Sequence, residues 1–211
     1  MRFIWSMPRC RYNQPSTRKR VKEVLRLIQQ KGIQHTIKLL DDNHEPFPTL
    51  ESPLLLGPVG RECHPKYLSH VDMTKAITTV LQVLERLHSF GWCHCDVRWP
   101  NVILDVIGTG EFVLIDFEYA RKVNEECPGI KKRFIHTDLQ KENKWRKFGD
   151  THQVVLMIQD WVEAHDTSHD SNIERALSTK WSASDLLEYV QGDMWKPTAA
   201  AATGSTDVVT E

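Results

Sequence analysis

The sequence predicts an α+β fold, with a β-containing first part and a mainly helical second part, on the basis of three observations. Apolar residues recur at helical spacing in four segments, at residues 17–31, 72–90, 154–162 and 182–190. Short apolar runs predict two strands in the first part of the chain, at 33–40 and 52–56. Two more apolar runs flank the turn Gly108-Thr109-Gly110 and predict a β-hairpin of residues 102–104 and 112–115.

The first two helices carry start and stop signals. Ser16 or Thr17 can cap the first helix, and Gly32 ends it. Asp72 is expected to cap the second helix, which ends near Gly91. The second helix has a long apolar stripe, so it should pack inside the core; the stripe consists of Ala76, Ile77, Val80, Leu81, Leu84 and Leu87.

The second part of the chain combines helices with polar stretches. Residues 154–162 are largely apolar and predict a buried helix, and Ser182 or Ser184 can open the last helix. Residues 119–149 are polar, rich in Lys and Arg and weakly periodic, so we expect a long functional loop there. Residues 196–211 are expected to form a disordered tail.

The composition excludes several classes of protein. With 211 residues, 40% hydrophobic and 26% charged, the chain is typical of one globular domain with its own core. A formal net charge of −1 gives no sign of a nucleic-acid or membrane partner, and no apolar run approaches the roughly 20 residues that span a bilayer. The first residues lack the features of a secretory signal, so we expect an intracellular protein. The sequence does not predict the oligomeric state.

The cysteines favour a reducing compartment. There are five of them, unevenly spaced, which does not suit a disulfide framework. Cys93-His94-Cys95 is a weak metal motif, because residues two apart do not easily ligate one ion and no second pair follows. We therefore do not expect a zinc site.

The most informative stretch lies in the middle of the chain. It runs from His94 through Asp96 to Asn101 and continues, after the predicted hairpin, at Asp116-Phe117-Glu118. Transfer of a phosphoryl group from a nucleotide requires a carboxylate near the accepting hydroxyl, oxygen ligands for Mg2+ and a cation near the moving charge. The spacing H-x-D-x-x-x-x-N followed by D-F-x supplies these groups and indicates such a reaction centre.

This pair of motifs resembles the catalytic loop and the magnesium-binding loop of the protein kinase superfamily. The resemblance implies that Asp96 orients the substrate hydroxyl and accepts its proton. Arg98 matches a position where protein kinases usually carry a lysine that contacts the transferring phosphate. Asn101 and Asp116 would hold Mg2+, and with it the phosphates of ATP.

The flanking segments resemble other parts of a kinase. The helix at 17–31 is similar to the mobile helix of the N-lobe, with Glu23 as a possible partner for a catalytic, nucleotide-binding lysine. Residues 54–60 resemble the hinge between the lobes. Asp150 resembles the buried aspartate that anchors the catalytic loop, and His94 would brace that loop against the residues around Phe117.

The resemblance implies three regions. Residues 1–60 would be a truncated N-lobe and hinge, residues 61–195 a kinase-like C-lobe, and residues 196–211 the tail. Arg98-Trp99-Pro100, with Gly91-Trp92 upstream, is similar to kinase-like domains of fungi and to Crinkler-type effectors.

The sequence also departs from the kinase pattern. No G-x-G-x-x-G turn and no V-A-I-K strand precede the first predicted helix, although Arg2 or Arg9 could substitute for the lysine by position. Glu118 replaces the glycine of D-F-G, and Cys95 replaces the arginine of H-R-D, so regulation by loop phosphorylation is not expected.

Three functions therefore stay open. The first is a Mg2+-dependent kinase that transfers the γ-phosphate of ATP to a Ser or Thr hydroxyl of a protein substrate. The second is a small-molecule kinase of the choline/ethanolamine or aminoglycoside type, because residues 114–120 are similar to the corresponding loop of choline kinases. The third is a catalytically impaired pseudokinase that acts as a binding module. Fold resemblance alone does not decide among them.

Overall fold

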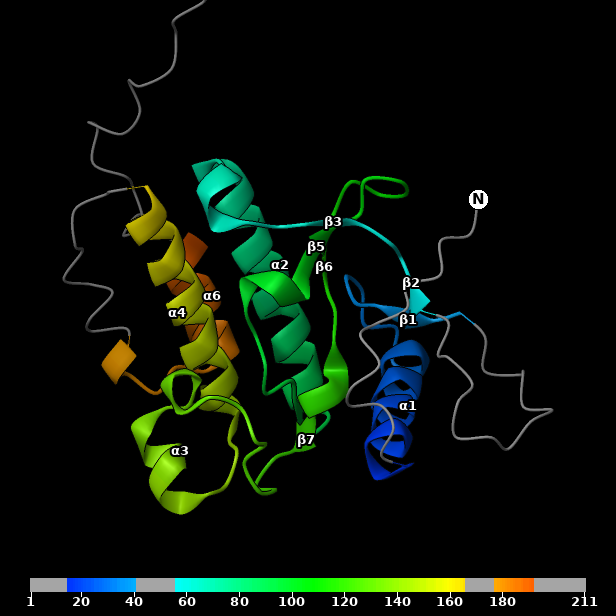
Figure 1. Cartoon of the computed structure of the whole chain (residues 1–211), viewed down its shortest axis with the longest axis vertical. Helices are drawn as coiled ribbons and strands as arrows, with labels where there is room; N and C mark the ends of the chain where they lie inside the picture. Colours follow the sequence, from blue (N-terminus) through cyan, green and yellow to red (C-terminus); the bar gives the residue numbers. More distant parts are fainter. Residues whose placement is uncertain (1–14, 41–55, 166–176, 192–211) are drawn as a thin grey trace, which may run out of the picture.

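The computed structural model describes residues 15–40, 56–165 and 177–191. Four helices dominate it, namely α1 (Pro15–Gln30), α2 (His70–Ser89), α4 (Lys147–Ala164) and α6 (Ala183–Gln191). Helix α2 lies in the centre, with α4 and α6 on one side and small sheets and α1 on the other (Figure 1). The predicted α+β class and its four helical segments are confirmed.

The core gathers around α2, as its apolar stripe predicts. Ile77 and Leu84 on this helix and Leu114 on the neighbouring hairpin are each 0% exposed. Burying an aliphatic side chain of this size contributes about 1.5–3 kcal/mol. The stripe therefore fixes α2 against the hairpin on one side and against α4 and α6 on the other.

The helix starts differ in detail from the predicted ones. Ser69, not Asp72, is the N-cap of α2, because its Oγ accepts from the Asp72 N–H at 3.1 Å and donates to Asp72 Oδ2 at 2.7 Å. Helix α1 begins at Pro15, so Ser16 and Thr17 lie within its first turn, and Gly32 follows it at φ 61°. For α6 the predicted cap is confirmed, since Ser182 Oγ accepts from the Asp185 N–H at 3.1 Å.

The sheets are short and antiparallel. β5 (Val102–Leu104) and β6 (Phe112–Leu114) form the predicted hairpin, with Ile103 opposite Val113, and β3 (Arg61–Glu62) extends it beside β5. β4 (Trp92–Cys93) pairs with β7 (Arg121–Lys122), and β1 (Lys38–Leu39) pairs with β2 (Leu56–Gly57). The hairpin and the β4–β7 pair place the two predicted loops next to each other.

The predicted strand at 33–40 is shorter than expected. Only Lys38 and Leu39 form strand β1, and Thr36 adds an isolated bridge to Leu114. Of the strand predicted at 52–56, only Leu56 lies within the described residues. The predicted tail at 196–211 lies outside them.

The prediction of one long loop at 119–149 was wrong, because the segment contains regular secondary structure. The segment contains β7, the 3-10 turn η4 (Lys132–Phe134) and helix α3 (Thr137–Glu142). It also forms a second apolar cluster of buried side chains, made of Cys93, Cys95, Ile135, Leu139 and Trp145. These elements are too short to produce a periodic pattern in the sequence. Packing around Trp145 and Leu139 holds them in place.

In the part of the chain that the structure describes, no helix combines the length and apolar character that crossing a bilayer requires.

Candidate active site

Asp96 lies in a buried loop between β4 and β5 and is held in one orientation. Its residue is 4% exposed, and its Oδ2 accepts from Asn101 Nδ2 at 2.9 Å and from Arg98 Nε at 3.1 Å. Asn101 Nδ2 also donates to the backbone oxygen of Asp96 at 2.7 Å. Among the described residues, Oδ1 of Asp96 has no hydrogen-bond partner, so one carboxylate oxygen is fixed and the other is available to a hydroxyl.

The loop around Asp96 is anchored by Trp99. Its ring is buried, and its Nε1 donates to the backbone oxygen of Met157 on α4 at 2.9 Å. Arg98, one residue earlier, keeps 42% of its side chain exposed. The loop therefore holds its backbone in the core and leaves the Arg98 guanidinium at the surface beside Asp96.

Asp116 follows β6 directly and adopts a left-handed backbone with φ 62°, while its Oδ1 accepts from the Glu118 N–H at 3.3 Å. The preceding residue, Ile115, donates its backbone N–H to the backbone oxygen of Asn101 at 2.9 Å. This bond places the residues predicted to hold Mg2+, Asn101 and Asp116, on adjoining stretches of backbone.

His94 links the two loops from inside the core. Its Nδ1 lies 3.3 Å from the Asp96 N–H, which makes Nδ1 the acceptor, and its Nε2 then donates to the backbone oxygen of Ile115 at 3.0 Å. The His94 ring also packs against Phe117, with ring centroids 4.7 Å apart. The His94 side chain thus contacts Phe117 and Ile115, in the region where the kinase resemblance implied that it would brace the loop.

Asp150, at the start of α4, binds the backbone of the loop that carries Asp96. Its Oδ2 accepts from the His94 N–H at 2.8 Å and its Oδ1 from the Cys95 N–H at 2.9 Å. Trp145 Nε1 donates to Oδ1 at 3.0 Å, and His88 Nε2 lies 2.9 Å from Oδ2. Burial would raise the pKa of the Asp150 carboxyl, but its interactions with the His88 and His94 side chains and the hydrogen bond from the Cys95 N–H leave the pKa below its ordinary value.

These bonds also explain an unusual backbone at Cys95. This residue has φ 69°, a left-handed conformation that costs a non-glycine residue about 1–3 kcal/mol. Asp150 binds its N–H, and Gln153 binds its carbonyl oxygen at 3.2 Å. The surrounding bonds therefore hold this left-handed conformation in the loop that carries Asp96.

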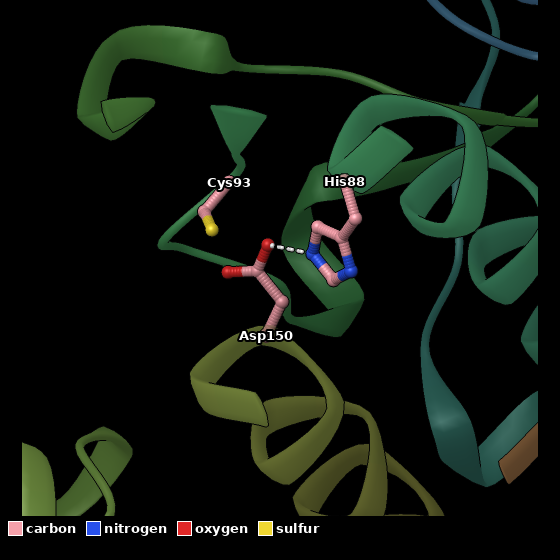
Figure 2. A group of neighbouring side chains, drawn as sticks. All are labelled: His88, Cys93 and Asp150. Atoms are coloured by element: carbon pink, nitrogen blue, oxygen red, sulfur yellow. Dashed lines mark hydrogen bonds and ion pairs between the residues drawn. The ribbon is translucent and has the colours of Figure 1, made fainter. Parts of the chain in front are cut away.

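His88, Cys93 and Asp150 form a close group that resembles a metal site (Figure 2). Asp150 points between His88 of α2 and the thiol of Cys93. However, its two carboxylate oxygens already accept from four donors. Burial, and secondly the charge of Asp150, raise the pKa of the Cys93 thiol well above its ordinary value, which disfavours the thiolate that a metal needs. We therefore interpret the group as a structural anchor.

Gln153 is a site residue that the sequence analysis missed. It is 1% exposed, its Oε1 accepts from the Val97 N–H at 2.8 Å, and its Nε2 donates to the backbone oxygens of Cys95 and Phe134, each at 3.2 Å. It lies almost one helical turn after Asp150, on the same face of α4. A buried polar residue at this spacing from the predicted anchor was the available signal.

Glu23 lies on α1, which packs against the 3-10 turn η3 (Phe117–Tyr119) after Asp116. Its carboxylate pairs with Lys122 of β7 at 3.0 Å, and both side chains are about half exposed, at 50% and 54%. The described partner of Glu23 is thus a lysine that follows Asp116 by six residues. Arg2 and Arg9 lie outside the described residues, so a pairing of Glu23 with a nucleotide-binding cation stays a prediction.

Comparisons with known proteins agree with the fold. No family model matches the chain. Crinkler effector protein 8 of Phytophthora infestans is 41% identical over 75 residues, which cover 36% of this chain and 12% of that protein. This chain therefore matches only a small part of the curated relative.

Among solved structures, the Cydia pomonella granulovirus kinase PK-1 superposes with a TM-score of 0.57 at 17% sequence identity. The match covers 82% of this chain and 66% of that one. The chain therefore has a protein-kinase-like fold, as the resemblance of its two central motifs implied.

Proposed function

We propose that this chain is a Mg2+-dependent phosphotransferase that moves the γ-phosphate of ATP to a Ser or Thr hydroxyl of a protein substrate. The observation that carries the proposal is the state of Asp96. Its carboxylate is buried, Asn101 and Arg98 fix one oxygen, and no described residue binds the other. A carboxylate in this state is suited to orient a hydroxyl and accept its proton.

Asn101 and Asp116 fit the ligand set that Mg2+ prefers. Asn101 donates to Asp96 only through Nδ2, which leaves its side-chain oxygen as a ligand atom. Asp116 adds a carboxylate from the adjoining backbone stretch. Mg2+ usually takes one or two such side chains together with phosphate oxygens. When bound, the ion would bridge the phosphates of ATP and neutralise charge that develops during transfer.

Arg98 would supply the second cation. Its Nε is bound to Asp96, and its remaining guanidinium nitrogens have no partner among the described residues. These groups lie beside the proposed base and are suited to contact an oxygen of the transferring phosphate. The name of the granulovirus protein, a kinase with a similar fold, supports the same reaction class.

A binding module without turnover is the second candidate, and two observations favour it. The sequence contains no glycine-rich turn before α1, and the described partner of Glu23 is Lys122 rather than a residue before that helix. Backbone N–H groups of such a turn normally hold the nucleotide phosphates. Binding of the nucleotide is therefore the first point to test.

The test has two stages. The melting temperature is measured with increasing ATP, with and without Mg2+, because a ligand that binds the folded state raises it. Transfer of radiolabelled phosphate is then followed to a mixture of proteins, to choline, to ethanolamine and to an aminoglycoside. We expect Mg2+-dependent binding and label in protein. Binding with label only in a small molecule would contradict the protein substrate, and no binding at millimolar ATP would favour the binding module.

A further inference from the structure

Three consecutive basic residues lie beside the candidate catalytic loop. The three residues, Lys131, Lys132 and Arg133, are all exposed. Lys132 and Arg133 belong to the turn η4, which ends at Phe134, and Lys131 directly precedes it. We refer to Lys131–Arg133 as the basic turn. It belongs to the segment 119–149, for which the sequence analysis expected a functional loop.

The basic turn is tied directly to the loop that carries Asp96. Gln153 Nε2 donates to the backbone oxygen of Phe134 and to that of Cys95, each at 3.2 Å, so one nitrogen atom lies between the two carbonyls. Cys95 is the residue immediately before Asp96. Phe134, which directly follows the basic turn, is therefore held close to the loop that carries the proposed base.

A second glutamine fixes the other side of the turn. Gln140 Nε2 donates to the backbone oxygen of Lys132 at 3.0 Å and to that of Ile135 at 2.7 Å. Gln140 thus fixes the backbone of the turn, while the three cationic side chains of the turn are exposed. Such a preformed arrangement reduces the entropy that a partner loses on binding.

The charge of the basic turn is poorly compensated within the described residues. Lys131 and Lys132 take part in no ion pair there, and Arg133 stacks on the Phe134 ring at 4.6 Å. Arg133 interacts electrostatically with the carboxylate of Asp160 on α4. Burial and secondly Glu163 raise the pKa of Asp160, and Arg133 acts in the opposite direction. Arg98 adds a fourth cation on the catalytic loop itself.

We propose that the basic turn selects acidic protein segments, so that the accepting Ser or Thr has Asp or Glu residues near it in sequence. The inference rests on the proposed function, because it assigns the substrate class of the same site. The chain as a whole has a net charge of −1, so it offers no general attraction to polyanions. The local excess of positive charge next to Asp96 instead favours a short acidic segment aligned with the site.

The experiment uses three synthetic peptides, each with one serine, flanked by Glu and Asp, by Ala and Gly, or by Lys and Arg. Initial rates of phosphate transfer from ATP and Mg2+ are measured with the wild-type chain. Several screened ion pairs together amount to roughly tenfold, so the acidic peptide should be preferred over the neutral one by about that factor. The preference should shrink as salt is raised, because exposed charges are screened.

Variants locate the effect. Lys131→Ala/Lys132→Ala/Arg133→Ala should abolish the preference and leave the rate on the neutral peptide unchanged. Lys132→Glu/Arg133→Glu should shift the preference to the basic peptide. The matched control, Lys141→Ala/Lys144→Ala, removes two exposed cations further along the same segment and should leave the preference intact. Melting temperatures of all variants should stay close to that of the wild type, since the changed side chains are exposed.

Binding is measured in parallel, by fluorescence anisotropy of the labelled acidic peptide without ATP. Equal rates and equal binding for the acidic and neutral peptides would overturn the inference while leaving phosphate transfer in place. The same holds if the preference survives the triple alanine variant. If no peptide accepts phosphate, the proposed function fails separately, and the inference then stands only if the triple variant loses binding of the acidic peptide.

Discussion

The carboxylate of Asp150 accepts a hydrogen bond from the backbone N–H of His94 at 2.8 Å, across 56 positions of sequence. One buried charge at the start of α4 thereby fixes the loop that carries Asp96. Asp150→Ala would leave the N–H groups of His94 and Cys95 without an acceptor in the core, so we expect a loss of about 3 kcal/mol in the free energy of unfolding. Denaturant unfolding measures this loss.

The matched control for this substitution is Glu163→Ala, which removes an exposed carboxylate from the same helix. We expect it to change the free energy of unfolding by less than about 0.5 kcal/mol. Equal effects of the two substitutions would contradict the anchoring role of Asp150.

His152 should make the fold sensitive to mild acid. Burial, and secondly the nearby His136, lower the pKa of His152 from 6.5 to about 4, and its Nδ1 has no partner among the described residues. Because the unfolded chain takes up this proton at a higher pH than the folded one, the contribution of His152 to stability is complete above pH 6.5 and is lost as the pH falls through about 4.

The measurement is the free energy of unfolding between these pH values for the wild type and for His152→Gln. We expect a weaker pH dependence in the variant, whereas His64→Asn, which changes an exposed histidine, should leave the dependence as it is. Superimposable pH profiles for the wild type and His152→Gln would refute this role.

Gln153 should stabilise the loop that carries Asp96 and the basic turn together. In Gln153→Ala the buried N–H of Val97 and the carbonyl oxygens of Cys95 and Phe134 lose their partner. We expect a loss of about 2 kcal/mol and faster hydrogen exchange at Val97. The control is Gln159→Ala on the same helix, because among the described residues the Gln159 side chain binds only Glu163. It should change neither the free energy of unfolding nor the exchange at Val97 by much. Unchanged exchange at Val97 would count against the role of Gln153.

Replacement of Asn101 should weaken the affinity for Mg2+ more than the affinity for ATP. Asn101→Ala removes the donor that fixes Asp96 and a proposed ligand of Mg2+. Because second-sphere and ligand losses typically cost 10–100-fold in metal affinity, we expect the Mg2+ concentration for half-maximal rate to rise at least about tenfold. A titration of rate against Mg2+ at saturating ATP measures this, and an unchanged midpoint with a lower plateau would show that Asn101 acts on Asp96 alone.

The sequence was sufficient for the parts of the fold that depend on local patterns. The long apolar stripe from Ala76 to Leu87 predicted the central helix, and the apolar runs around Gly108–Gly110 predicted the hairpin. The motifs also led to Asp150, whose burial and contacts with the loop match the anchor implied by the resemblance. These features depend on spacing within one segment or on a motif of fixed length.

The remaining features depend on contacts between distant segments. The order in residues 119–149 comes from packing of Trp145 and Leu139 against Cys93 and Cys95, which no local periodicity reveals. Gln153 binds the loop around Asp96 only because the fold packs α4 against that loop. The cap of α2 was misplaced because Ser69 and Asp72 are both good capping residues, and their mutual hydrogen bonds decide which of them lies at the end.

The most direct test of the central claim compares phosphate transfer from radiolabelled ATP by the wild-type chain and by Asp96→Asn. The amide keeps the shape of the side chain but cannot accept the hydroxyl proton, so the account predicts Mg2+-dependent transfer by the wild type and a loss of at least about 100-fold in the variant. Glu111→Gln, which removes an exposed carboxylate from the hairpin, should retain the full rate. Transfer by Asp96→Asn at the wild-type rate, or no transfer by a wild-type chain that binds ATP and Mg2+, would contradict the account.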